Sequence, residues 1–220
     1  MSKIRRKINN ERIKQAKEAL KGNDAILVTE PEEIVFEPKN GQAKKGLIFY
    51  PGGLVEPESY ATLCEQIAEQ GYFVVIVPMR ANLAILSPDR ADRIIEAYKD
   101  ITTWAIGGHS LGGVMAANYA ASHEAISGVV LYASYPQGEA LKESTLPVLS
   151  IYGEKDGVAN LDKVKNAALP KQASLREIKG GNHCYFGSYG MQKGDNEASI
   201  TPEEQQEQAA KETAAFLEQL

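Results

Sequence analysis

Five short, continuously apolar runs separated by segments of helical length constrain the fold of this chain more than any other feature of its sequence. The runs occupy residues 47–50, 73–77, 104–106, 129–132 and 148–152. A strand covered on one face alternates apolar and polar residues, whereas a strand covered on both faces is apolar throughout. We therefore predict a doubly wound α/β fold, with a mostly parallel sheet and helices on both of its faces.

The segments on either side of these runs predict the edges of the sheet. Residues 25–28 and 34–36 are short apolar runs around a turn, which favours an antiparallel pair at the start of the chain. Residues 175–178 alternate and indicate an edge strand. A threonine, a proline and two glutamates open the segment 201–220 and predict a final helix. We expect its run of Gln and Glu at 203–208 to face solvent.

The first residues differ in character from the rest of the chain. Residues 1–22 are highly charged with a poor apolar stripe, so we predict a peripheral helix there and a single α/β domain over residues 23–220. A helix that binds a membrane surface needs a dense leucine or aromatic face, which this segment lacks. We therefore expect no membrane association.

Composition excludes other classes of function. The chain has 220 residues, with 29 acidic and 24 basic side chains and a formal net charge of −5. This balance gives no basic footprint for nucleic acid. Its two cysteines, Cys64 and Cys184, form neither a C-x-x-C motif nor a disulfide framework, which is typical of a reducing cytoplasm. We expect a cytoplasmic protein that acts on a small molecule; its oligomeric state stays open.

The strongest local motif is the sequence Gly-Gly-His-Ser-Leu-Gly-Gly at residues 107–113. Gly108, Ser110 and Gly112 form Gly-x-Ser-x-Gly between a predicted strand and a predicted helix. A strand that turns sharply into a helix leaves room only for glycines two positions before and after its corner residue. The motif alone arises by chance in about one chain in fifteen of this length, and a tightly packed or phosphate-binding turn is the alternative. Its position between strand and helix favours Ser110 as a nucleophile.

A nucleophilic serine needs a histidine base, and the chain offers three histidines. His109 directly precedes Ser110, and we interpret it as structural. His123 lies at the polar end of the helix after Ser110, where we expect solvent. His183 lies in the loop after the last strand, and in hydrolases with this turn the base follows the acid and the serine in the chain. We therefore predict His183 as the base.

The base in turn needs an orienting acid. Asp156 follows the apolar run 148–152, at the carboxyl end of a strand, where catalytic groups of α/β sheets gather. An Asp-Gly pair at this position is also an ordinary turn sequence. Glu154 is the nearest alternative and Asp162 a more distant one; we favour Asp156.

An oxyanion hole requires two backbone N–H groups. The first is expected from Leu111, the residue after the nucleophile. The second is expected from the loop after the first long strand, where residues 51–55 read Pro-Gly-Gly-Leu-Val. Gly53 or Leu54 is the expected donor, and the sequence does not separate them.

Together, the order of these residues, the Pro-Gly-Gly loop and the serine motif resemble the α/β-hydrolase superfamily over residues 26–220. Within it the chain is similar to the small, compact branch of serine hydrolases and esterases related to dienelactone hydrolase. Residues 180–195 are similar to a subgroup of largely uncharacterised bacterial hydrolases. Dienelactone hydrolases carry a cysteine at the position of Ser110, so the serine implies a general esterase instead.

The resemblance implies a carboxylesterase-like enzyme that cleaves an ester or thioester through an acyl-enzyme, with a Ser110–His183–Asp156 triad, no metal and no cofactor. Hydrolases of this fold often carry a cap, but residues 135–146 are too few to build a helical lid. We therefore expect an open site that favours short-chain or exposed esters. An acyltransferase with the same triad, a non-catalytic binding protein, and a carbon–carbon or peptide hydrolase are the alternatives.

Overall fold

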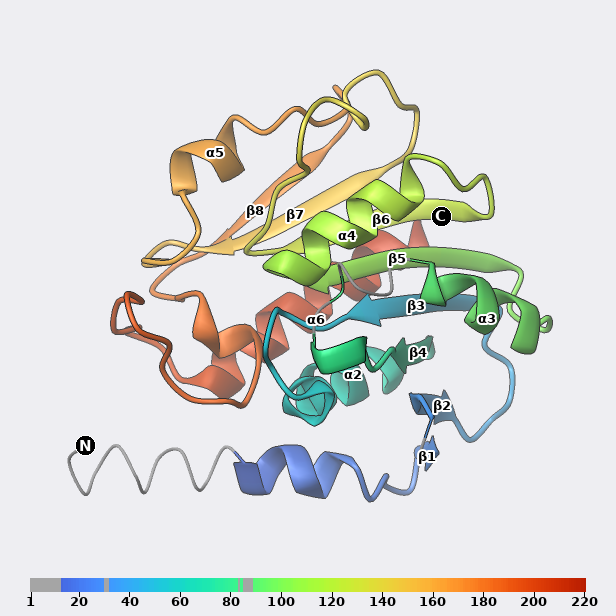
Figure 1. Cartoon of the computed structure of the whole chain (residues 1–220). Coiled ribbons are helices and arrows are strands. Elements are labelled where there is room, and N and C mark those ends of the chain that lie inside the picture. The colour runs from blue at the N-terminus through green and yellow to red at the C-terminus, as the bar shows by residue number, and fades with distance from the viewer. Residues whose placement is uncertain (1–12, 30–31, 83, 85–88) are drawn as a thin grey trace.

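A single twisted sheet forms the centre of the computed structural model, which describes residues 13–29, 32–82, 84 and 89–220 (Figure 1). Among these residues the sheet has eight strands in the order β1-β2-β4-β3-β5-β6-β7-β8. Their bounds are β1 Ile26–Thr29, β2 Ile34–Pro38, β3 Lys45–Tyr50, β4 Phe73–Ile76, β5 Thr103–His109, β6 Ile126–Tyr132, β7 Val148–Gly153 and β8 Ser174–Ile178. β1 and β2 are antiparallel to their neighbours, and all other pairs are parallel. The predicted antiparallel start, parallel centre and edge strand are confirmed.

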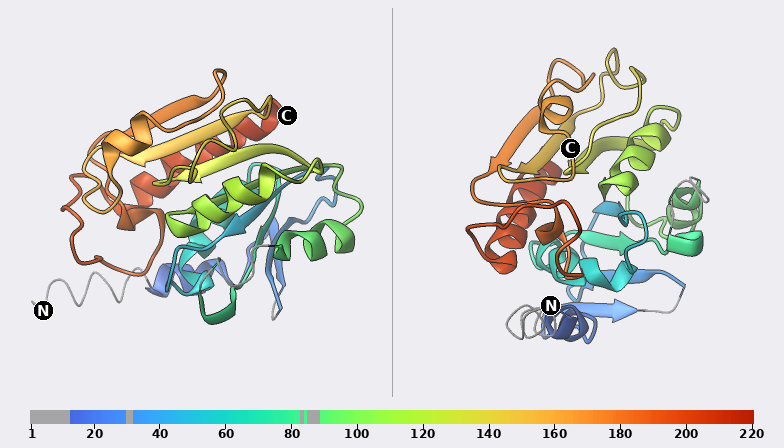
Figure 2. Two further views of the ribbon diagram at one scale, coloured as in Figure 1. Left: turned by 45° about the horizontal axis from the view of Figure 1, so that its top comes forward. Right: turned by 60° about the vertical axis from the view of Figure 1, so that its left-hand side comes forward.

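Helices cover both faces of this sheet (Figure 2). The short helix at residues 13–19, α2 and α6 pack on one face, and α3 and α4 pack on the other. The bounds of the other helices are η1 Pro57–Tyr60, α2 Ala61–Ala68, η2 Arg80–Asn82, α3 Arg90–Ala97, α4 Leu111–Ala120, α5 Leu161–Lys165, η4 Cys184–Phe186 and α6 Pro202–Glu218. The doubly wound architecture predicted from the apolar runs is therefore confirmed.

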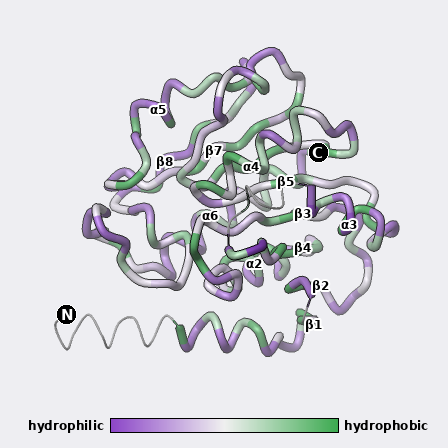
Figure 3. The backbone as a smooth tube through the Cα atoms, in the orientation of Figure 1, coloured by the Kyte–Doolittle hydropathy of each residue, from purple (hydrophilic) through white to green (hydrophobic). Residues whose placement is uncertain are grey.

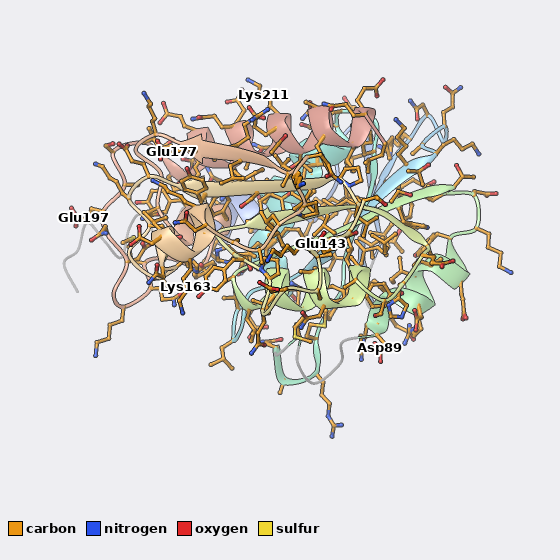
Figure 4. All side chains as sticks on the ribbon, turned by 90° about the horizontal axis from the view of Figure 1, so that it is seen from above. Asp89, Glu143, Lys163, Glu177, Glu197 and Lys211 are labelled. Atoms are coloured by element: carbon orange, nitrogen blue, oxygen red, sulfur yellow. The ribbon has the colours of Figure 1, made fainter. Side chains whose placement is uncertain are left out.

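The central strand β3 shows why its sequence is apolar throughout. Leu47 and Phe49 pack toward α2 and α6, whereas Ile48 and Tyr50 pack toward α3 and α4, and all four are fully buried. Successive side chains of a strand point to opposite faces, so a strand between two helical layers needs apolar residues at every position. Hydrophobic residues accordingly gather in the central strands (Figure 3), and charged side chains such as Lys211 and Glu197 extend outward (Figure 4).

The predicted N-terminal helix lies only partly within the described residues. The segment between β6 and β7, predicted to be too short for a lid, lies wholly within them. Residues 13–19 are helical, and Ala16 and Ala19 are buried against the domain. The predicted helix over residues 1–12 lies outside the described part of the chain. Residues 133–147, between β6 and β7, contain neither helix nor strand, so no cap domain is present there. Within the described ranges, no helix combines the length and apolar character needed to span a membrane.

The predicted start of α6 is confirmed, but the expectation that residues 203–208 all face solvent was wrong at two positions. Thr201 and Glu204 form a capping box that begins the helix as predicted. However, Gln205 is 0% exposed and Gln206 is 2% exposed, so the run at 203–208 does not simply face solvent. The helical period places these two residues on the same face as Ala209, toward the core and the loop after β8.

The side chains of Glu65 and Glu69, at the C-terminal end of α2, share one hydrogen-bond donor, the side-chain amide of Asn23. The Asn23 side-chain amide donates to Glu65 at 3.0 Å and to Glu69 at 2.9 Å. Burial, and to a lesser extent the neighbouring Glu69, raises the pKa of Glu65 from its ordinary value of 4.5 to about 7. The folded protein therefore holds a proton on Glu65 over a range of pH in which the unfolded chain releases it.

This raised pKa predicts how the stability of the fold depends on pH. The contribution of Glu65 to stability is fully present below pH 4.5 and is lost as the pH rises through about 7. Glu65→Gln removes the titration, so we expect the variant to gain stability relative to the wild type between pH 5 and pH 8. Urea unfolding at both pH values measures this, with Glu58→Gln, which removes an exposed carboxylate, as the control. An equal difference between Glu65→Gln and wild type at the two pH values would contradict the assignment.

Candidate active site

The three predicted catalytic residues follow three parallel strands at their carboxyl ends. Ser110 follows β5, Asp156 lies three residues after β7, and His183 lies in the loop after β8. Because these strands are parallel, their carboxyl ends meet at one edge of the sheet (Figure 1). The fold therefore delivers all three residues to the same edge.

Ser110 occupies the sharp turn between β5 and α4. Its backbone lies at φ 52° and ψ −120°, which is a strained conformation for a residue with a side chain. Two hydrogen bonds hold the turn: Ser110 N–H donates to the Tyr132 carbonyl at 3.0 Å, and the Ser134 hydroxyl donates to the Ser110 carbonyl at 2.7 Å. The strain of about 1–3 kcal/mol is thus offset by bonds to the end of β6.

The glycines of the motif are required by close packing, as the sequence predicts. A Cβ atom on Gly108 would lie 2.6 Å from the Tyr50 carbonyl oxygen, and one on Gly113 would lie 2.6 Å from the Gly108 carbonyl oxygen. Gly112 is packed even more tightly against the Tyr50 and Pro51 carbonyls. Side chains at these positions would push α4 away from β3 and β5 and open the turn.

Backbone strain is concentrated along this same edge. Within the described ranges, the non-glycine residues with positive φ are Leu54, Ala81, Asn82, Ser110 and Ala133. They follow β3, β4, β5 and β6, so four neighbouring loops carry strained positions. Such conformations cost about 1 kcal/mol or more each, and they cluster where function requires a precise shape. This distribution favours the carboxyl edge of the sheet as the location of a functional site.

Asp156 and His183 form a buried hydrogen-bonded pair. Nδ1 of His183 lies 2.8 Å from Oδ2 of Asp156, and the two side chains are 1% and 0% exposed. The other carboxylate oxygen accepts the N–H groups of Val158 at 2.8 Å and Ala159 at 2.7 Å. Since a carboxylate only accepts, Nδ1 of His183 donates this bond, and in the neutral form of imidazole Nε2 then carries the free lone pair.

The other polar groups of His183 have hydrogen-bond partners, but among the residues that the structure describes Nε2 does not. Its N–H donates to Oδ1 of Asp195 at 3.3 Å, and its carbonyl lies 3.1 Å from Nε2 of His109. Nε2 of His183 is buried and has no hydrogen-bond partner in the described part of the chain. The bond from Ser110 to Nε2 is therefore not formed in this structure; catalytic hydrogen bonds of free enzymes often form only with substrate.

The alternative acids and the other histidines have different partners. Glu154 accepts the N–H of Gly180 at 2.8 Å, and Asp162 lies in the first turn of α5. The ring of His123 stacks on Tyr119 at a centroid distance of 3.7 Å, half-buried on the α4 side of the molecule. Of the candidate acids, Asp156 is the one that contacts His183.

The predicted oxyanion donors differ in their hydrogen bonds. Leu111 is the first residue of α4, where backbone N–H groups have no acceptor within the helix. The N–H of Leu54 already donates to the Asn82 carbonyl at 2.8 Å. The N–H of Gly53 has no hydrogen-bond partner in the parts of the chain that the structure describes. Between the two residues that the sequence left open, Gly53 is thus the free donor.

Sequence reasoning missed the residues that hold the loop of His183 in place. Gln205 accepts the Asn182 N–H at 2.9 Å and donates to the Asn182 carbonyl at 2.7 Å. Gln206 donates to the Tyr185 carbonyl at 3.2 Å. The period of the final helix could have placed both glutamines on its buried face, but the sequence does not show which backbone they meet.

A third missed residue, Asp195, joins the turn of Asp156 to the loop of His183. Its Oδ1 accepts the Gly157 N–H at 3.0 Å as well as that of His183, and its Oδ2 accepts the Cys184 N–H at 2.9 Å. Gly157 directly follows Asp156. One carboxylate therefore fixes the main chain beside both members of the buried pair.

The thiol of Cys184, in the residue after His183, is uncharged. Burial raises the pKa of the Cys184 thiol to about 12, so the neutral sulfur accepts the Gln192 N–H at 2.9 Å and is no nucleophile at neutral pH. In the ranges that the structure covers, no three His, Cys, Asp or Glu side chains converge as metal ligands.

These hydrogen bonds predict that replacement of Asp195 makes the loop of His183 less ordered. Asp195→Asn replaces one accepting oxygen by an NH₂ group that faces backbone N–H donors, so we expect a loss of about 1–3 kcal/mol of unfolding free energy. Hydrogen exchange at the amides of His183 and Cys184 should become faster. Asp162→Asn, at the start of α5, is the matched control and should leave both amides unchanged. Unchanged exchange in Asp195→Asn would refute this role.

Comparison with known protein families agrees with the fold. The model of the alpha/beta hydrolase family matches residues 46–207, from the first long parallel strand into α6. A comparison with curated proteins gave no match. The matched segment covers most of the chain and contains the turn of Ser110, the pair of Asp156 and His183, and the loop with Gly53. The chain therefore belongs to the α/β hydrolase family.

Proposed function

We propose that this protein is a serine hydrolase that cleaves a carboxylic ester or thioester through an acyl-enzyme on Ser110. Membership of the α/β hydrolase family supports hydrolysis in general. The observation that carries the finer proposal is the buried pair of Asp156 and His183, in which Nε2 of the histidine has no partner among the described residues. A buried imidazole with one free nitrogen, beside a strained serine turn at the same sheet edge, is suited to remove a proton from that serine.

The proposed reaction has two steps. Nε2 of His183 takes the hydroxyl proton as Oγ of Ser110 attacks the carbonyl carbon, and the proton then passes to the leaving alcohol or thiol as the acyl-enzyme forms. In the second step, His183 takes a proton from water, which attacks the acyl group, and the proton returns to Ser110 as the acid leaves. Asp156 orients the ring and stabilises the imidazolium in both steps.

The negative charge on the carbonyl oxygen needs two fixed donors. We assign these to the N–H groups of Leu111 and Gly53. The support for Gly53 over Leu54 is that the N–H of Leu54 is already bound to Asn82. The start of α4 adds the positive end of a helix dipole to the Leu111 donor.

Replacement of the nucleophile tests the proposal directly. We expect Ser110→Ala to abolish labelling by a fluorophosphonate probe and to lower kcat for p-nitrophenyl butyrate by at least about ten-thousand-fold, because the variant lacks the hydroxyl on which the proposed acyl-enzyme forms. Ser122→Ala, at the end of α4, is the control and should label like the wild type. Labelling of Ser110→Ala at the wild-type rate would disprove the role of Ser110, and an unlabelled wild type would disprove the catalytic proposal.

The absence of a cap between β6 and β7 predicts a preference for short acyl chains. Without a lid, a long chain gains little buried apolar area on binding, at about 0.8 kcal/mol for each buried CH₂ group. We expect kcat/KM for p-nitrophenyl esters to be highest from acetate to butyrate and not to increase with longer chains. Steady-state kinetics over acyl lengths of two to twelve carbons measure this. A steady increase up to dodecanoate would show an extended apolar site instead.

A further inference from the structure

The residue before the nucleophile is part of a buried chain of hydrogen bonds. The hydroxyl oxygen of Tyr60, at the end of η1, accepts the Gly52 N–H at 3.0 Å and lies 2.9 Å from Nδ1 of His109. On the other side of the ring, Nε2 of His109 lies 3.1 Å from the His183 carbonyl oxygen. Tyr60 is 0% exposed and His109 is 1% exposed. We call this arrangement the Tyr60–His109 bridge.

The position of each proton in the bridge follows from its partners. A carbonyl oxygen only accepts, so Nε2 of His109 carries a proton and donates to His183. Burial, with the nearby His183 as a second cause, lowers the pKa of His109 well below its usual value, so the ring is neutral and Nδ1 is an acceptor. Burial likewise raises the pKa of Tyr60, which keeps its proton and donates it to Nδ1. The bridge therefore runs in one direction, from Gly52 through Tyr60 and His109 to His183.

Packing holds both ends of the bridge rigidly. A Cβ atom on Gly52 would lie 2.7 Å from the Tyr60 hydroxyl and 2.9 Å from Nδ1 of His109, so the loop after β3 lies directly against the bridge. The rings of His109 and His183 contact each other at a centroid distance of 4.5 Å, and Phe186 packs beside them at 5.8 Å from His109. The loop after β3 and the ring of His183 therefore both pack directly against the bridge.

Three parts of the proposed machinery meet at this bridge. Gly52 precedes Gly53, the assigned oxyanion donor; His109 precedes Ser110; and the carbonyl that accepts from His109 belongs to His183. We propose, on the basis of the function proposed above, that Tyr60 and His109 are positioning residues that hold the oxyanion loop in register with the catalytic base. Neither touches the substrate or takes part in proton transfer.

A neutral bridge also suits the charge that develops during the reaction. His183 becomes positively charged when it takes the serine proton, and a second cation in the contacting ring of His109 would oppose this step. With its nitrogens bonded to Tyr60 and to a carbonyl, His109 stays neutral while it fixes the loop. Precise placement matters because a displacement of about 1 Å from the productive geometry can lower the rate by about a hundredfold.

Removal of the tyrosine hydroxyl tests the bridge. Tyr60→Phe leaves the ring in place but frees Gly52 N–H and Nδ1 of His109, so we expect kcat for p-nitrophenyl butyrate to fall by about 10- to 100-fold while KM changes by less than about threefold. Tyr72→Phe is the matched control. It removes a hydroxyl that donates to Glu218 at 3.0 Å, from a residue that is 8% exposed at the amino-terminal end of β4. Its kcat should equal that of the wild type.

A spectroscopic measurement tests the bridge without reference to turnover. The ¹⁵N chemical shifts of the His109 ring should show the neutral Nε2–H form from pH 5 to pH 9 in the wild type and in Ser110→Ala. A charged ring, or a proton on Nδ1 in place of Nε2, would overturn the proposed direction of the bridge. This measurement stays informative even if Tyr60→Phe folds poorly.

The outcomes separate this inference from the proposed function. If the fluorophosphonate probe fails to label the wild type, the catalytic proposal fails, and the positioning role fails with it even where the ¹⁵N shifts support the bridge. If the probe labels Ser110 but Tyr60→Phe keeps the kcat of Tyr72→Phe, the catalytic proposal stands and the positioning role is overturned. A lower kcat for Tyr60→Phe at nearly constant KM, together with the neutral Nε2–H form of His109, supports both.

Discussion

The hydrogen bond between Asp156 and His183 is buried from water on both sides, and much of the carboxyl edge of the sheet is organised around it. A buried carboxylate is tolerated only when its oxygens have donors, and here the imidazole and two backbone N–H groups supply them. Loss of either partner would leave a polar group unpaired in the interior, at a cost of several kcal/mol. The pair therefore fixes the distance between the turn after β7 and the loop after β8.

Further bonds keep that loop from moving as a unit. Asp195 binds the main chain beside both members of the pair, and Gln205 binds both backbone groups of the residue before His183. α6 thus holds the loop of His183 through Gln205, and the Tyr60–His109 bridge connects this loop to the loop after β3. These bonds hold the backbone of the loop in place before any substrate arrives, and fixed backbone dipoles stabilise a transition state most effectively when they are held in this way.

The strained turn at Ser110 depends on the same supports. A residue at φ 52° would relax if its surroundings gave way, but its N–H and carbonyl are bonded to the end of β6, and glycines pack α4 closely on β3. Because His109 immediately precedes this turn, the bridge and the turn constrain each other. The packing of three strands and one helix therefore maintains the strained backbone of Ser110.

The sequence by itself determined the class of the fold and predicted the nucleophile of the proposed site. Continuous apolar runs require helices on both faces of a sheet, and the glycines around Ser110 allow only a tight turn, so both can be read locally. It also singled out Asp156 and His183, because parallel strands bring their carboxyl ends together. The tertiary structure decided the contacts between segments far apart in the chain: the pairing of Asp156 rather than Glu154 with His183, the engagement of Leu54 by Asn82, and the burial of Gln205 against the catalytic loop. These contacts depend on the distances between loops in the folded protein. The sequence shows the period of each helix and strand, but it does not show how far apart their loops lie.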